Sequence, residues 1–138
     1  MKESRYGMGV DVALPYEQAL ERTTEELKKE GFGVLTTIDV KQTLKQKLDK
    51  EFRRYTILGA CNPALAHRAL SAEKDIGLLL PCNIIVYEGD TPGTSVVAAM
   101  DPIEALSLTG RSDIQAVATE VRERLQKVLE HLEQGATS

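Results

Sequence analysis

Hydrophobic and polar residues alternate along one short stretch near the start of the chain, and four further short stretches rich in apolar residues also predict β-strands, five in all. Successive side chains of a strand point to opposite faces, so one face of each strand is expected to be buried. The predicted strands cover residues 8–14, 34–38, 55–60, 83–87 and 95–100. Pro92 and Gly93 lie between the last two strands, and this turn predicts an antiparallel hairpin.

The first predicted strand has one face made of unusually small residues. Its large apolar residues alternate with Gly7, Gly9, Asp11 and Ala13. Small residues in a strand allow a ligand, a partner subunit or a neighbouring element to approach the backbone closely. We therefore expect something to cover this side of the sheet.

Four longer segments have the apolar spacing of helices. Tyr16 lies near the start of the first, which Gly31 ends, and Asp39 is placed to cap the second. Asn62 followed by Pro63 is a strong helix start, because proline is tolerated in the first turn. The last helix is the most secure element, with one continuous apolar stripe made of Ile114, Val117, Ala118, Val121, Leu125, Val128, Leu129 and Leu132.

Together these elements predict an α+β domain in two layers. Its single sheet of about five strands, mostly antiparallel or mixed, carries helices packed on one face. One domain is expected over residues 1–138, with a frayed tail at 134–138. A sheet covered on one side leaves its second face open, and a two-fold homodimer is the commonest way to cover it.

Composition and charge narrow the classes of function. The net charge of −4 and the pI of about 5.3 argue against a nucleic-acid-binding domain that works by bulk electrostatics. No apolar run approaches the roughly 20 residues of a membrane span, and no signal-peptide core follows Met1. The sequence therefore predicts a cytoplasmic protein with no membrane or nucleic-acid partner, whose two cysteines are thiols rather than a disulfide. The lysine-rich helix at 41–50, followed by Arg53 and Arg54, suits either contact with a nucleic acid or an acidic partner or an ordinary solvated face, and the solvated face is the preferred interpretation.

The candidate chemistry gathers around a Cys-Asn-Pro block and a later Pro-Cys-Asn block. The candidate ligand-binding residues are Cys61, Asn62, His67, Cys82 and Asn83. Cys61 comes just before a helix start, where backbone N–H groups and the helix dipole favour a thiolate, and such a cysteine suits nucleophilic, redox or metal chemistry. The alternative is that Cys61 is a small apolar residue at the end of a core strand.

Two further kinds of site remain open from the residues. Cys61, His67 and Cys82 are three soft ligands that zinc accepts, although they form no compact motif such as C-x-x-C. Asp39, Asn62 and Asp101 each follow a predicted strand and precede a predicted helix. If these three junctions lie at one edge of the sheet, their helix N-termini converge there and could bind an anionic substrate of a small-molecule enzyme. Ordinary helix capping also explains all three. His131 is expected to be a solvated residue near the end of the last helix.

The chain resembles the domain-of-unknown-function 302 family over nearly its whole length. Four blocks carry the resemblance: Gly31–Leu35 with Ile38 and Asp39, Leu58–Pro63 with Ala66 and His67, Leu79–Asn83 with Val86 and Tyr87, and Met100–Pro102. The resemblance implies a two-layer α+β fold related in outline to the TATA-binding-protein class, and a tight homodimer. It implies no DNA binding, activity, substrate or cofactor, because that fold hosts many functions.

Three hypotheses for function follow. The first is a homodimeric ligand-binding or sensor module for a small molecule, with its pocket near the Cys-Asn-Pro helix start. The second is a thiol-based redox or zinc-binding protein that uses Cys61, His67 and Cys82. The third is an enzyme with an anion site at its helix N-termini. Catalytic residues are not predicted, and zinc is the one cofactor that the residues suggest.

Overall fold

A computed structural model describes residues 1–135. The fold contains one six-stranded sheet. The strand order is β1-β2-β6-β5-β4-β3, and every neighbouring pair is antiparallel. The strands are β1 (Lys2–Glu3), β2 (Gly7–Val12), β3 (Gly33–Asp39), β4 (Tyr55–Cys61), β5 (Cys82–Glu88) and β6 (Ser95–Met100). The predicted α+β class and the β5–β6 hairpin are confirmed. The additional strand, β1, is only two residues long, which is too short to show a period.

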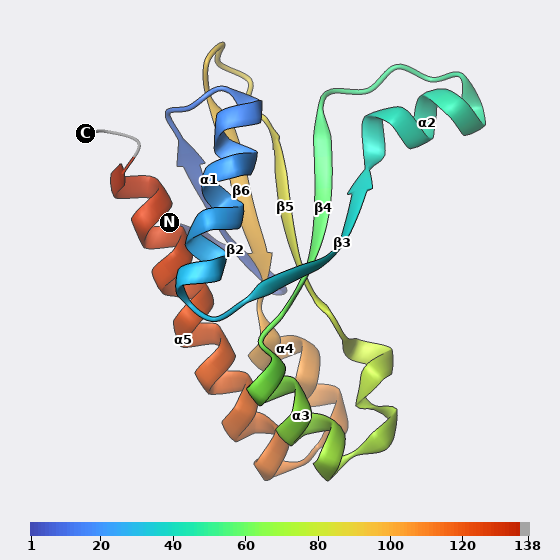
Figure 1. Ribbon diagram of the computed structural model, residues 1–138, viewed down its shortest axis with the longest axis vertical. Helices are drawn as coiled ribbons and strands as arrows, with labels where there is room; N and C mark the ends of the chain where they lie inside the picture. Colours follow the sequence, from blue (N-terminus) through green and yellow to red (C-terminus); the bar gives the residue numbers. More distant parts are fainter. Residues whose placement is uncertain (136–138) are drawn as a thin grey trace.

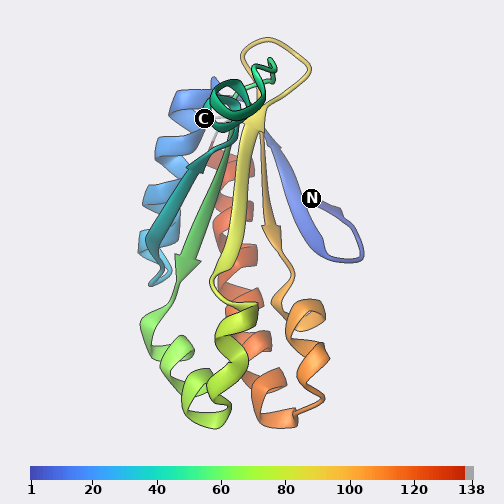
Figure 2. The ribbon, with the colours of Figure 1, turned by 90° about the vertical axis from the view of Figure 1, so that its right-hand side faces the viewer.

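Two helices cover one face of this sheet, as Figures 1 and 2 show. They are α1 (Tyr16–Lys29) and α5 (Ser112–Gly135). All eight apolar residues of the stripe predicted for the last helix are buried. The predicted frayed tail at 134–138 begins within α5, and residues 136–138 lie outside the described part of the chain.

The core lies between these helices and the sheet. Buried and less buried residues alternate along the central strands, so each strand turns one set of side chains toward α1 and α5. The largest buried side chains of the sheet in this core include Val12, Ile84, Val86 and Val97. The alternate residues line the other face, which no helix covers in the view of Figure 2.

The two ends of the sheet differ. At one end, four short helices pack near the N-terminal half of α5 (Figure 1). They are α3 (Pro63–Ala72), η1 (Lys74–Leu79), α4 (Pro102–Leu106) and η2 (Ser107–Thr109). At the opposite end, α2 (Val40–Leu48) projects away from the body of the protein (Figure 1). None of the residues 35–54 is buried.

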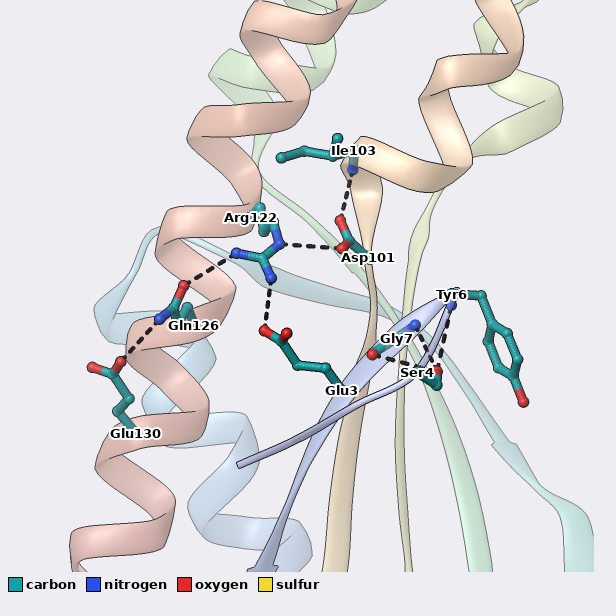
Figure 3. A network of polar contacts seen from close by, with 9 residues as sticks. All are labelled: Glu3, Ser4, Tyr6, Gly7, Asp101, Ile103, Arg122, Gln126 and Glu130. Carbon is teal, nitrogen blue, oxygen red and sulfur yellow. Dashed lines mark hydrogen bonds and ion pairs between the residues drawn. The ribbon is translucent and has the colours of Figure 1, made fainter.

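The short edge strand β1 is tied to α5 by the ion pair between Glu3 and Arg122, which Figure 3 shows. Arg122 of α5 binds Glu3 at 3.0 Å and Asp101 at 3.2 Å. Asp101 also caps α4 by accepting a hydrogen bond from the N–H of Ile103. Arg122 therefore joins three segments that are far apart in the sequence. Within residues 1–135, no helix combines the length and apolar character that crossing a membrane requires.

Candidate functional site

The candidate site begins where β4 ends and α3 starts. Asn62 is buried, and its Oδ1 accepts a hydrogen bond from the N–H of Leu65 at 3.3 Å. Pro63 occupies the first turn of α3, where its missing N–H costs no hydrogen bond. The helix start predicted from these residues is therefore present, and it holds the end of β4 against the core.

Strand pairing brings the second cysteine to the same place. Ala60 of β4 lies directly opposite Cys82 of β5 in the antiparallel register. Cys61 is thus one residue out of register with Cys82, on the neighbouring strand. Both cysteines are free thiols, with Cys82 buried and Cys61 half-buried. The peptide bond between Leu80 and Pro81, just before Cys82, is cis.

A pocket of about 270 Å³ opens beside these two thiols. Its walls come from the ends of β4 and β5, from α3, η1 and α4, and from the N-terminal half of α5. The lining residues are Phe32, Leu35, Ala60, Cys61, Asn62, Leu65, Ala66, Ala69, Leu70, Gly77, Leu80, Pro81, Cys82, Pro102, Leu106, Val117 and Val121. None of these lining residues is charged, and Asn62 is the one with a strongly polar side chain.

Burial makes both thiols weaker acids than usual. It raises the pKa of Cys61, and it raises the pKa of Cys82 to about 11, with the nearby Cys61 adding to that shift. The prediction that the helix N-terminus acidifies Cys61 is therefore wrong. The cause is desolvation, because a buried thiolate loses its hydration. Both cysteines are protonated at neutral pH and are poor nucleophiles.

Three of the five predicted site residues share this pocket, and two do not. Cys61, Asn62 and Cys82 line it. His67 is exposed on α3 and is not part of the lining, and Asn83 lies on the open face of the sheet instead. Residues 1–135 contain no group of three or more His, Cys, Asp and Glu side chains that could hold a metal ion. The arrangement therefore does not support a zinc centre made from Cys61, His67 and Cys82.

The three predicted helix N-termini do not converge either. Asn62 and Asp101 follow the parallel strands β4 and β6, whereas Asp39 follows β3, which runs in the opposite direction. Asp39 therefore lies at the other end of the sheet. Each of the three side chains accepts a hydrogen bond from an N–H of its own helix. Capping, the alternative that the sequence also allowed, explains these residues, and the three junctions do not share one edge of the sheet.

His131 has a partner that the sequence pattern does not indicate. Its Nδ1 lies 3.2 Å from Oε2 of Glu26, a side chain of α1 that is 4% exposed. Burial alone would raise the pKa of Glu26, but hydrogen bonds from Lys29 and His131 outweigh it, so this pKa is lowered. His131 therefore helps to hold α5 against α1 and is not simply solvated.

A second depression lies on the open face of the sheet, and neither cysteine lines it. This trough has a volume of about 790 Å³, and its lining comes from β1, β2, β4, β5, β6 and α4. Tyr55 and Tyr87 lie on it with stacked rings 5.1 Å apart. Gly7 and Gly9, the small residues that predicted a covered face, belong to its lining.

The apolar wall of the thiol pocket is the part that sequence reasoning missed. Leu106, Val117 and Val121 line it from α4 and α5, about 40 to 60 residues along the chain from Cys61. Their apolar spacing is visible in the sequence, but it predicts an ordinary core. Only the packing of α5 against α3 turns these residues into the wall of a pocket.

Comparison with known proteins identifies a family and a similar solved structure. The family described as "Domain of unknown function DUF302" matches residues 8–132. A crystal structure of an uncharacterized conserved DUF302 protein from Bacillus stearothermophilus is similar, with 30% identity and a TM-score of 0.85 over 94% of this chain and 99% of that chain. No curated protein matches. Because the family match spans most of the sequence, this chain belongs to the DUF302 family.

Proposed function

We propose that this protein is a binding or sensor module for a small, uncharged, apolar molecule, which it holds in the pocket beside Cys61 and Cys82. The observation that carries the proposal is the lining of that pocket, where apolar side chains from three strands and three helices surround a single buried amide, that of Asn62. Ligand sites are typically concave and apolar, with few polar groups that fix the orientation of the ligand.

Size and charge define the class of ligand. The volume of about 270 Å³ exceeds the roughly 150 Å³ of a cavity that holds benzene, so it suits two small rings or a medium-length aliphatic chain. A charged group would lose its hydration in this lining without gaining a counter-ion. The preferred ligand is therefore neutral, and its one polar group is expected to lie near Asn62.

The state of the thiols favours binding over thiol catalysis. A nucleophilic or redox-active cysteine needs a thiolate, and burial raises the pKa of both cysteines. Protonated thiols behave as small, polarizable apolar groups. Cys61 and Cys82 thus contribute to an apolar surface that a neutral ligand can contact.

A fluorescence titration with the neutral probe N-phenyl-1-naphthylamine tests the proposal. Ala66 lines the pocket from α3, whereas Ala64 is exposed on the same helix. We expect saturable binding by the native chain and by Ala64→Trp, and binding weakened at least about tenfold in Ala66→Trp, because the indole fills the space. Circular dichroism checks that both variants are folded. Equal binding by the two tryptophan variants, or no saturable binding by the native chain, would overturn the proposal.

The same titration tests whether the pocket prefers neutral over charged ligands. 1-Octanol and octanoate have the same chain length and differ mainly in the charge of the head group. We expect 1-octanol to displace the probe and octanoate at neutral pH to displace it much less. Equal displacement by both would contradict a site that excludes charge.

A further inference from the structure

We propose that the pocket beside Cys61 and Cys82 selects neutral carbonyl compounds, such as ketones, over hydrocarbons of the same shape. The side-chain amide of Asn62 makes this selection by donating a hydrogen bond to the carbonyl oxygen of the ligand. This inference rests on the proposed function and adds to it the chemical class of the ligand.

The side-chain amide of Asn62 is held in one orientation. Its Oδ1 accepts a hydrogen bond from the N–H of Leu65, in the first turn of α3, at 3.3 Å. The NH₂ group of an amide has only donors, so it cannot take the place of this oxygen. Oδ1 is therefore fixed on the helix start, and the nitrogen Nδ2 is left to make other contacts.

Nδ2 of Asn62 has two N–H donors, and the hydrogen bonds found within residues 1–135 give it no acceptor. Asn62 as a whole is only 7% exposed. In the same part of the chain, the one fully enclosed side-chain polar atom without a partner belongs to Glu73, so Nδ2 keeps some accessible surface. Because Asn62 lines the pocket, we infer that this surface faces the pocket.

The groups nearest to Nδ2 supply donors and no acceptor. A Cβ added at Gly31 would lie 3.0 Å from Nδ2 of Asn62 and 3.3 Å from Nη1 of Arg124, so the two nitrogens approach the same space. Nη1 already donates a hydrogen bond to the carbonyl oxygen of Glu30 at 3.3 Å. The surroundings of Nδ2 are therefore electropositive, which favours an oxygen atom with lone pairs over a second donor.

The other lining side chains cannot replace the amide. The thiols of Cys61 and Cys82 are weak donors, and the remaining side chains of the lining are hydrocarbon. A ligand with one carbonyl group thus has one place for its oxygen and apolar contacts for the rest. A hydrocarbon in the same position would take Nδ2 out of contact with water and give it no acceptor, which costs binding free energy.

Displacement of N-phenyl-1-naphthylamine by 1-tetralone and by tetralin tests this inference. Both have the same two fused rings, and 1-tetralone has a carbonyl group in place of one CH₂. The measured quantity is the ratio of the dissociation constant of tetralin to that of 1-tetralone, compared between proteins. Because the ratio is compared between proteins, the difference in hydrophobicity between the two molecules cancels.

Asn62→Asp removes the donor while keeping the helix cap, because Asp and Asn are equally good at this position. We expect the ratio to fall at least about fivefold in Asn62→Asp, since its carboxylate has no N–H for the carbonyl oxygen. Asn62→Ser, which also caps a helix, gives the same comparison without a charge. Ratios unchanged from the native chain in these variants would overturn the inference.

Asn83→Asp is the matched control. It makes the same chemical change on the residue after Cys82, but Asn83 is exposed and lines the trough on the open face. Its ratio should equal that of the native chain. A ratio that falls as far as in Asn62→Asp would show that added charge, and not the amide of Asn62, causes the change.

The infrared carbonyl band of bound 1-tetralone reports on the hydrogen bond directly. A hydrogen bond weakens the C=O bond, so we expect the band at lower frequency in the native chain than in Asn62→Asp. Equal frequencies would contradict a bond from Asn62. A native chain that binds the probe as expected but gives unchanged ratios overturns this inference alone. Absence of saturable probe binding overturns the proposed function and this inference with it.

Discussion

Helices α2 and α3 have the same kind of N-terminal cap but differ in what they pack against. Each follows a strand, and each has an Asx side chain that accepts a hydrogen bond from an N–H in its first turn. Helix α3 buries Leu65 and Ala69 against the core and forms one wall of the thiol pocket. Helix α2 buries no residue. Local signals thus determine where a helix starts, whereas the rest of the fold determines what it packs against.

The difference has its origin in sheet topology. β4 runs toward the end where α5 extends past the sheet, so α3 emerges beside an apolar helix and packs on it (Figure 1). β3 runs in the opposite direction at the edge of the sheet, so α2 emerges where no helix is available. The end of the sheet near α3 therefore has buried side chains, among them Leu65 and Ala69. Helix α2, at the other end, has none.

The largest expected contrast comes from removing one leucine from each helix. Leu65→Ala should lower the free energy of unfolding by about 2–5 kcal/mol, because Leu65 is buried and its removal leaves a cavity. Leu48→Ala should change it by no more than about 0.5 kcal/mol in protein dilute enough to be monomeric, because Leu48 is already exposed to water. Urea denaturation measures both values. Similar costs for the two variants would mean that α2 packs against its own chain.

The fold could largely be predicted from the sequence because its strands are short apolar stretches separated by turn or capping residues and its helices have a clear period. The five predicted strands correspond to β2 to β6, and the apolar stripe of α5 is buried as expected. Strand β1 was not predicted. It is held by antiparallel pairing with β2 and by the ion pair between Glu3 and Arg122. Both depend on distant residues, so no local pattern indicates them.

The candidate site was only partly predictable. Cys61, Asn62 and Cys82 meet because β4 and β5 are neighbours, and strand order is not visible in the sequence. Asn83 is adjacent to Cys82 in sequence but points to the opposite face, as the period of a strand requires. The local helix start suggested an acidic Cys61, whereas burial, which depends on tertiary packing, raises its pKa.

The dependence of stability on pH would test how completely the Cys82 thiol is buried. The pKa of Cys82 is about 11 in the folded protein, compared with an ordinary value of 9.0, because the thiol is buried. Between these two values the unfolded chain loses a proton that the folded chain keeps. Stability is therefore unaffected below about pH 9 and falls as the pH rises toward 11, by roughly 2–3 kcal/mol.

Comparison with Cys82→Ala isolates this contribution, because tyrosines and lysines also titrate in the same range. Urea denaturation on both sides of pH 9 should give a shallower loss of stability for Cys82→Ala than for the native chain. Cys61→Ala, which changes a thiol that is only half-buried, should retain most of the native slope. Identical slopes for all three proteins would indicate that water reaches Cys82.

The smallest expected effect comes from removing the two caps. Asn62→Ala should cost about 1–2 kcal/mol in global unfolding, because α3 unfolds together with the core that it covers. Asp39→Ala removes an equivalent hydrogen bond, yet it should cost only a few tenths of a kcal/mol in the monomer, since α2 can unfold without exposing any buried residue. Hydrogen exchange separates these cases. In Asp39→Ala, the amides of residues 43–48 should exchange faster while those of α3 keep their native rates, and equal acceleration in both helices would show that α2 does not unfold independently of α3.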